Sequence, residues 1–375
     1  MIGSLPLPVE LVSRPSQLDV TVRELVGSNA IALDTESNSF HHYPEQLCLI
    51  QIASRHKVYI IDTIALKELD PLNEVLVDNS IKKVIHGADY DIRSLDRHYG
   101  FRIRNLFDTS IAARFIGIAK FGLAALTRDL LGITISKSKR LQRADWGRRP
   151  LSAEALEYAA TDVRHLLTMQ KTLGKRLQAL GRTAWVTEEC ARIEEVRYTA
   201  PNLETAYLSV KGTKDLDGHG LAVLQSLFLF REKEARRQQR PPFMVLPGAT
   251  LIFLAINPEA NFSEVPGLGQ SGLKRFGQGL RQALHNGKTA PPIHRPRLIK
   301  AIRASKEQAQ RLIRLKEWRT SLGSSLSLDP SLLWPLTSLE RLAKEPDTLN
   351  VELASDEIRH WQRDVVASSL KACLS

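Results

Sequence analysis

The chain has 375 residues, of which 43% are hydrophobic and 25% charged, and its formal net charge at pH 7 is +11. This composition is ordinary for a globular protein, and the length predicts two or three domains. The sequence lacks the run of about 18 apolar residues that a membrane span needs, and its start lacks the pattern of a signal peptide. The cysteines Cys48, Cys190 and Cys373 have no metal-type spacing, which favours a reducing compartment, the cytoplasm.

The first 200 residues alternate short β-rich runs with helical patterns, which predicts an α/β domain. Strands are predicted at residues 30–36, 47–53, 57–62 and 82–86, and helices at residues 70–78, 91–100, 108–117 and 122–132. Gly100, Gly117 and Gly132 fit the C-terminal ends of such helices. A longer helical pattern begins at Ser152, a predicted N-cap, and continues to Leu180.

The chain after residue 215 has a helical pattern with proline and glycine at its boundaries. A weak repeat relates two parts of it: Arg231, Pro242, Pro247, Leu251 and Pro258 recur 88 residues later as Arg319, Pro330, Pro335, Leu339 and Pro346. One register shared by five positions predicts two copies of a helical module. Residues 201–303 also contain 15 Lys and Arg against 7 Asp and Glu, which favours a polyanion partner such as nucleic acid over a merely solvated basic surface.

The stretch IALDTES at residues 31–37 places two carboxylates in a predicted strand. Asp34 and Glu36 are two residues apart, so their side chains share one face of the strand. Like charges this close disfavour each other's ionisation, and a divalent cation would offset the repulsion. Taken alone, the pair also fits a strand end with both acids in solvent.

Two later stretches add carboxylates and a phenol. Asp91, in HGADYDIRSL at 86–95, lies early in a predicted helix, where an acid also favours the helix N-terminus. Tyr158 and Asp162, in LEYAATDVRHLL at 156–167, are four residues apart and share one helix face. Together these residues suit a pair of hard cations held by oxygen ligands from several segments, with a phenol to orient the attacking water.

In this order the three stretches resemble the three exonuclease motifs of the DEDDy 3′-to-5′ exonucleases. The segment KSKRLQRADWGRRPLSAEALEYAATDV resembles the ribonuclease D group more narrowly, and the helical module resembles the HRDC domain, of which ribonuclease D carries two. The resemblance implies a ribonuclease H-like α/β exonuclease domain at 1–200, an HRDC domain at 215–290 and an HRDC-like domain at 304–375. It assigns the metal-ligand positions to Asp34, Glu36, Asp91 and Asp162, and the water-orienting position to Tyr158. The His-to-Asp spacing of the second motif selects Asp91 over Asp89.

Substrate contacts are predicted from charge and aromatic character. A basic loop at 136–149 suits phosphates, and Trp146 within it suits stacking on a base or capping of the core. We expect these substrate-binding residues: Gln51, His86, Lys139, Arg140, Arg143, Trp146 and Arg149. In the first helical module the expected RNA-binding residues are Arg236, Arg237, Arg240, Lys274 and Arg275, whereas the second module, neutral overall, is expected mainly to pack or to shape a channel.

The resemblance implies a cytoplasmic 3′-to-5′ exoribonuclease that uses two divalent ions, Mg²⁺ or Mn²⁺. Its expected partners are tRNA precursors with 3′ extensions and other small structured RNAs, with no membrane partner, and a monomer is expected. Two alternatives stay open at this point. The same metal chemistry would serve a DNA exonuclease, and a non-catalytic RNA-binding scaffold would share the basic surface but would have no need for crowded carboxylates.

Overall fold

The computed structural model describes residues 7–136, 138–295 and 304–374. These residues form two compact units. One unit contains the described residues up to Glu36, residues 47–198 and the helices after residue 304. The other contains residues 37–46 together with the described residues from 199 to 295. The first six residues of the predicted exonuclease domain and the last residue of the second module lie outside the described residues.

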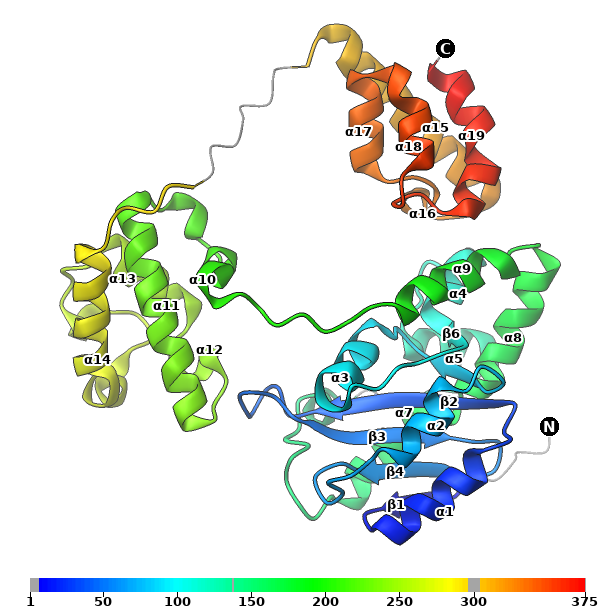
Figure 1. The fold of residues 1–375 in the computed structure, drawn as a ribbon, viewed down its shortest axis with the longest axis horizontal. Coiled ribbons are helices and arrows are strands. Elements are labelled where there is room, and N and C mark those ends of the chain that lie inside the picture. The colour runs from blue at the N-terminus through cyan, green and yellow to red at the C-terminus, as the bar shows by residue number, and fades with distance from the viewer. Residues whose placement is uncertain (1–6, 137, 296–303, 375) are drawn as a thin grey trace. The chain divides into compact units, whose positions relative to one another are not determined.

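A six-stranded mixed sheet is the centre of the first unit (Figure 1). In spatial order its strands are β1 (Val9–Val12), β4 (Val58–Asp62), β3 (Leu47–Ala53), β2 (Ala30–Ser37), β5 (Lys82–Ile85) and β6 (Leu106–Asp108). Strand β3 is antiparallel to β4, whereas β2, β5 and β6 run parallel to one another and β1 runs parallel to β4. The four predicted strands and the α/β class are confirmed. The edge strands β1 and β6 have only four and three residues and escaped prediction.

The predicted helices of this domain are present, the longest of them broken in two. The helices are α1 (Pro15–Leu25), α2 (Pro71–Val77), α3 (Asp89–Tyr99), α4 (Thr109–Phe115), α5 (Leu123–Leu131), α6 (Lys139–Gln142), α7 (Ala153–Arg164), α8 (Leu166–Ala179) and α9 (Thr183–Glu194). Of these, α1, α6 and α9 escaped prediction. Gly100 and Gly132 end α3 and α5 in the left-handed conformation, and the Ser152 hydroxyl caps α7 by accepting from the Ala155 amide at 3.1 Å. The pattern predicted from Ser152 to Leu180 is two helices, because the backbone departs from helical geometry at His165.

The rest of the chain is helical and repeats itself. The first module contains α10 (Leu203–Ala206), α11 (Gly218–Gln238), α12 (Pro242–Val245), α13 (Gly248–Ile256) and α14 (Gly269–Thr289), with 3₁₀ turns at Tyr207–Ser209, Thr213–Asp215 and Phe262–Glu264. The second contains α15 (Lys306–Leu326), α16 (Pro330–Leu333), α17 (Leu336–Lys344), α18 (Leu349–Ala354) and α19 (His360–Leu374), with a 3₁₀ turn at Pro346–Thr348. Helices α15, α16 and α17 begin and end 88 residues after α11, α12 and α13, so the repeat is a repeat of structure. None of the described helices is long and apolar enough to cross a membrane.

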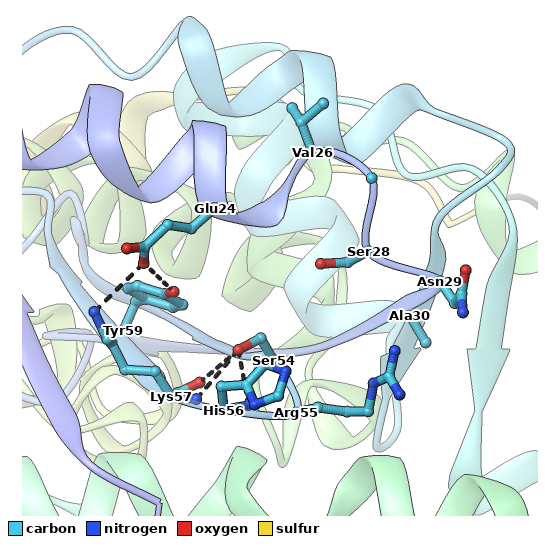
Figure 2. A pocket seen from close by; sticks show the side chains of 11 residues that line it. Glu24, Val26, Ser28, Asn29, Ala30, Ser54, Arg55, His56, Lys57 and Tyr59 are labelled. Atoms are coloured by element: carbon cyan, nitrogen blue, oxygen red, sulfur yellow. Dashed lines mark hydrogen bonds and ion pairs between the residues drawn. The ribbon is translucent and has the colours of Figure 1, made fainter.

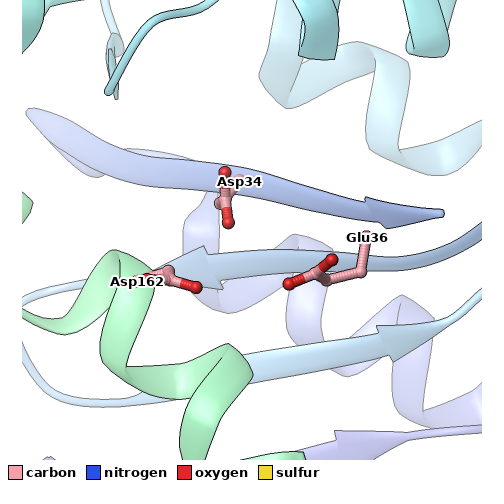
Figure 3. A group of neighbouring side chains, drawn as sticks. All are labelled: Asp34, Glu36 and Asp162. Atoms are coloured by element: carbon pink, nitrogen blue, oxygen red, sulfur yellow. The ribbon is translucent and has the colours of Figure 1, made fainter. Parts of the chain in front are cut away.

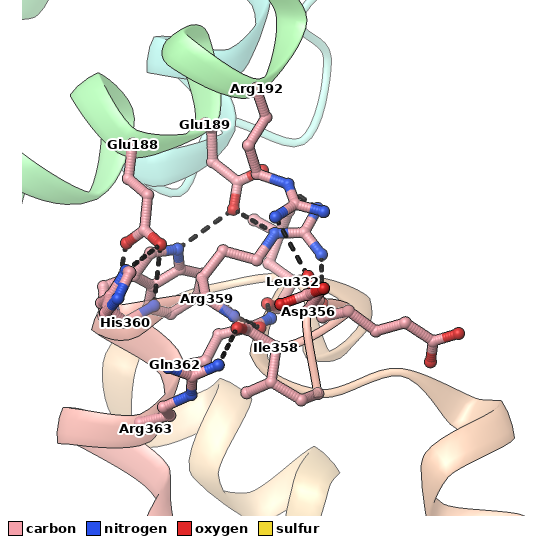
Figure 4. A network of polar contacts seen from close by, with 12 residues as sticks. Glu188, Glu189, Arg192, Leu332, Asp356, Ile358, Arg359, His360, Gln362 and Arg363 are labelled. Atoms are coloured by element: carbon pink, nitrogen blue, oxygen red, sulfur yellow. Dashed lines mark hydrogen bonds and ion pairs between the residues drawn. The ribbon is translucent and has the colours of Figure 1, made fainter. Parts of the chain in front are cut away.

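The second module docks on α9 of the α/β domain (Figure 4). Glu189 accepts from both Arg359 Nε and Arg359 Nη2, at 2.9 and 3.2 Å, and from the Trp361 indole at 3.0 Å. Glu188 accepts from the amides of His360 and Trp361 at 2.7 and 3.2 Å. The Trp361 ring stacks on Trp185 with centroids 4.9 Å apart. The start of α19 is therefore fixed to the α/β domain by both charged and aromatic contacts.

Replacing Arg359 by Gln should lower the melting temperature by roughly 2–6 °C, because Glu189 loses two charge-assisted hydrogen bonds at a partly buried position. Thermal unfolding followed by circular dichroism measures the shift. Arg192→Gln is the matched control, since this guanidinium donates across the same contact to a single exposed carbonyl, that of Asp356. Equal shifts for the two variants would show that the ion pair between Arg359 and Glu189 is not what holds α19 on α9.

Candidate active site

Three of the four predicted carboxylates meet at one end of the sheet (Figure 3). Asp34 and Glu36 stand at the end of β2, and Asp162 reaches them from α7, which packs against β3 and β4. One carboxylate oxygen from each lies within 4.8 Å of the others. Alternation along β2 puts Asp34 and Glu36 on one face, and α7 covers that face with the stripe that contains Asp162.

The fourth carboxylate lies beside this cluster through a residue that the sequence analysis did not single out. Asp91 is 5% exposed, and its Oδ1 accepts from the Thr35 hydroxyl at 2.6 Å. Strand β2, which contains Thr35, is the parallel neighbour of β5, the strand that leads into α3 and Asp91. The only sequence signal for Thr35 is its place between Asp34 and Glu36.

A second buried acid shapes the turn that precedes Asp91. Asp108 accepts from the amides of Gly87 and Ala88 at 3.1 and 2.8 Å, and it also caps α4 by accepting from Ser110 and Ile111. Gly87 has a φ of +75°, a conformation that favours glycine. Asp108 therefore orients the start of α3, a role that no local pattern indicates because Gly87 and Ala88 lie about 20 residues before it.

The cluster is electrostatically crowded. Burial raises the pKa of Asp34 well above its ordinary value, and the charges of Asp91, Asp162 and Glu36 raise it further. Burial, then Asp162 and Asp91, raises the pKa of Glu36 in the same way. Burial raises the pKa of Asp91 to about 7, although the Thr35 hydroxyl opposes this. An all-oxygen donor set with this much repulsion fits a hard divalent cation, which would favour the ionised forms.

Tyr158 lies one helical turn before Asp162, as the spacing predicts. Its ring packs against Trp146 with centroids 6.0 Å apart. Burial raises the pKa of the Tyr158 phenol, and the charges of Asp162 and Glu36 add to the increase, whereas a hydrogen bond with the Gln142 side chain opposes it. The phenol therefore keeps its proton at neutral pH and is a donor or acceptor of hydrogen bonds, not a base.

A groove of about 380 Å³ runs along α7 beside the cluster. Tyr158 and Asp162 line it together with Glu154, Thr161 and His165, which share their face of the helix. Residues 133–136, Ser138 and Leu141 contribute the opposite wall. Of the four carboxylates, Asp162 lines this groove, so space for a nucleotide-sized ligand lies beside the cluster at α7.

Several of the predicted substrate-binding side chains are buried in the domain or already paired with other groups of the protein. Gln51 is fully buried in the middle of β3, and Trp146 is 1% exposed, so neither is accessible to a base in this structure; of its two predicted roles, Trp146 fills the core. Arg149 makes a bidentate ion pair with Asp62, at 2.5 and 2.6 Å, and also donates to the Cys48 carbonyl. This guanidinium holds the loop before α7 against the sheet.

The remaining predicted contacts in this domain are more accessible. Lys139 and Arg143 are exposed, and Arg140 is exposed but paired with Glu154 at 2.5 Å. His86 is half-buried, with Nδ1 2.9 Å from the Thr109 hydroxyl. Thr109 also donates to the Ile85 carbonyl, so its oxygen accepts from the His86 Nδ1–H. Phosphate contacts by the basic loop remain a prediction for Lys139, Arg140 and Arg143.

The predicted RNA-binding residues of the first module are all exposed and gather where α11 ends and α14 begins: Arg236, Arg237, Arg240, Lys274 and Arg275. Arg275 is 3.5 Å from the Gln238 side chain, which joins the two groups. Arg237 is paired with Glu234 at 2.6 Å. Within the same unit, Tyr43 donates to Glu232 at 2.5 Å and lies under Arg236, 5.3 Å from its guanidinium carbon, so Tyr43 contacts the first module.

A different cavity of about 460 Å³ lies at the other end of β2, next to Ala30 (Figure 2). Lys57 bridges Glu10 and Glu24 there, at 2.8 and 3.4 Å, and the Tyr59 hydroxyl donates to Glu24 at 2.5 Å. Along β2, Ala30 is four residues from Asp34 and six from Glu36, about 13 and 20 Å. We therefore place the active site at the carboxylates, and not at this larger space.

The fold and the carboxylate cluster define a 3′–5′ exonuclease, a hydrolase of phosphodiester bonds. Residues 9–178 match the family model described as 3′-5′ exonuclease, and residues 220–284 match the HRDC domain. Ribonuclease D of Zymomonas mobilis is 32% identical over 76% of this chain and 74% of its own length. Ribonuclease D of Desulfotalea psychrophila is 29% identical over 88% and 90%. The crystal structure of Escherichia coli RNase D shares the fold, with a TM-score of 0.74, 24% identity and coverage of 98% and 99%. The chain belongs to the ribonuclease D family.

Proposed function

We propose that this protein is a metal-dependent exoribonuclease that removes nucleoside 5′-monophosphates one at a time from the 3′ ends of RNA. The observation that carries the proposal is the convergence of Asp34, Glu36 and Asp162, with Asp91 bound to the intervening Thr35. RNA as the polymer is supported by the family to which the chain belongs and by the basic composition of residues 201–303. Structured RNAs with 3′ extensions, tRNA precursors among them, are the proposed substrates.

Each residue of the site has a proposed task. Asp34, Glu36, Asp91 and Asp162 would hold two divalent cations, Mg²⁺ or Mn²⁺, through their oxygens. Such cations, when bound, supply charge stabilisation at the scissile phosphate and a more acidic water. The Tyr158 phenol, which stays protonated, would orient the attacking water by a hydrogen bond. Lys139 and Arg143 would contact the phosphates upstream, and the exposed cations of the first module would add salt-sensitive affinity.

A single-stranded 3′ end suits this site, since its bases need not be unstacked before the terminal nucleotide reaches the carboxylates. The direct test is a time course on a 5′-labelled tRNA with a 3′ tail, run beside a DNA of the same sequence, in Mg²⁺ and in EDTA. A ladder that shortens from the 3′ end of RNA alone, and that EDTA abolishes, is the expected result. A ladder on both polymers would support the exonuclease activity but contradict the preference for RNA over DNA. RNA binding without any ladder would support the scaffold alternative.

A further inference from the structure

We propose that the first helical module binds a nucleotide of single-stranded RNA in a cavity beside α14, apart from the basic cluster at the end of α11. The cavity has a volume of about 400 Å³ and lies between residues 258–262 and one face of α14. Sites for small ligands typically have about 300–1,000 Å³. The nature of the ligand rests on the proposed function, because RNA is the polymer that the exonuclease site would shorten.

The lining of this cavity combines an apolar floor with an unpaired cation. Leu273 and Leu284 contribute apolar surface, and the half-buried ring of Phe262 forms a wall. The guanidinium carbon of Arg281 lies 5.7 Å from the centroid of that ring. None of the described residues accepts a hydrogen bond from this guanidinium. A base that stacks on Phe262 would bring its phosphate to the free N–H groups of Arg281, which is how single strands are usually held.

Two further cations stand on the same face of the helix. Arg281, His285 and Lys288 follow one another at intervals of four and three residues, so their side chains project from one stripe. Lys288 pairs with Glu259 across the cavity, but the two side chains are 38% and 80% exposed. Such exposed pairs contribute about 0–1 kcal/mol, so a phosphate can displace Glu259 from Lys288 at little cost.

The stripe also connects the cavity with the predicted RNA-binding end of the module. Lys274 lies seven residues before Arg281, two turns along the same face of α14. From Lys274 to Lys288 the helix rises about 21 Å. A single-stranded RNA bound in the cavity would therefore continue along α14 toward Lys274 and Arg275.

The second module shows that these cations are not needed for the fold. It repeats α11, α12 and α13 as α15, α16 and α17, and α19 occupies the place of α14 in the order of helices. After Arg363, however, α19 has Lys371 as its single cation. The same helical framework thus forms without the stripe, which favours a binding role for Arg281 and Lys288 over a structural one.

The test compares two double variants of the full chain. Arg281→Gln with Lys288→Gln neutralises the cavity, whereas Lys211→Gln with Lys214→Gln removes the same charge from exposed positions of the module outside it. Binding of a 5′-labelled oligouridylate is measured in EDTA at several salt concentrations. We expect the cavity variant to bind about tenfold more weakly, with a shallower salt dependence, and the control to change little. Phe262→Leu keeps an apolar side chain in the cavity but removes the ring on which a base would stack, so it should also weaken binding.

Equal losses in the two double variants, or unchanged binding in the cavity variant, would overturn the proposal. A loss as large for duplex RNA would do the same, because bases in a duplex cannot enter a pocket. The time course on the 3′-tailed RNA in Mg²⁺ separates this proposal from the proposed function. If the wild type gives no ladder there, the exoribonuclease proposal fails, while the binding comparison in EDTA still tests the cavity.

Discussion

Replacing Asp34 by Asn should lower the rate of nucleotide release by at least about 10⁴-fold, while binding of RNA in EDTA stays close to that of the wild type. Asp34 lies at the centre of the carboxylate cluster, within reach of Glu36 and Asp162, and it interacts electrostatically with Asp91. An amide has the same shape but carries no charge for a divalent cation. Single-turnover cleavage of a 3′-tailed RNA measures the effect. A variant that degrades RNA at near the wild-type rate would remove the active-site assignment.

Two readouts that do not depend on activity accompany this variant. Mn²⁺ should raise the melting temperature of the wild type, because a ligand that binds the native state stabilises it, and this increase should shrink or vanish in Asp34→Asn. Without metal we expect the opposite ranking of the two proteins by stability. The variant should be more stable than the wild type, by on the order of 1 kcal/mol, because one of several mutually repelling carboxylates is gone.

Asp89→Asn is the matched control for the second motif. Asp89 is two residues from Asp91, but its side chain is 54% exposed and pairs with Arg93 on the surface of α3. Asp91 is buried and bonded to Thr35. Asp89→Asn should therefore retain nearly full activity, and Asp91→Asn should lose most of it. The reverse result would mean that the spacing selected the wrong aspartate.

Local pattern was sufficient for the parts of the site that depend on periodicity. Alternation along a strand put Asp34 and Glu36 on one face, and the spacing of four put Tyr158 and Asp162 on one face of α7. The Ser152 cap and the glycines that end α3 and α5 are likewise set by residues within one helical turn. These features follow from backbone geometry, which a single sequence specifies directly.

Features that depend on distant partners could not be predicted in this way. Arg149 looked like a phosphate contact until the fold placed Asp62, 87 residues earlier, against it. For Trp146 the sequence left both stacking on a base and capping of the core open, and its burial follows from the packing of the loop before α7 against Tyr158. Thr35 and Asp108 support Asp91 through side-chain bonds that have no sequence period. The docking of α19 on α9 likewise joins residues about 170 apart.

Replacing Tyr158 by Phe should lower the rate of the chemical step by about 10²–10⁴-fold, the usual contribution of a positioned proton-transfer or water-orienting group. Only the hydroxyl is removed, so the ring should keep its contact with Trp146 and the protein its stability. The carboxylates are unchanged, so the Mn²⁺-induced rise in melting temperature should persist. This combination of lost rate and retained metal binding would distinguish the phenol from the metal ligands.

Tyr59→Phe provides the matched control for this substitution. Its hydroxyl is also buried in a hydrogen bond, to Glu24 at 2.5 Å, but at the opposite end of the sheet from the carboxylates. If loss of a buried hydroxyl only destabilises the protein, Tyr59→Phe should be less stable than the wild type. Its cleavage rate should stay near that of the wild type. If Tyr158→Phe also cleaved RNA at near the wild-type rate, the water would have to be oriented by another group. Gln142, whose side chain lowers the pKa of the Tyr158 phenol, would then be the residue to replace next.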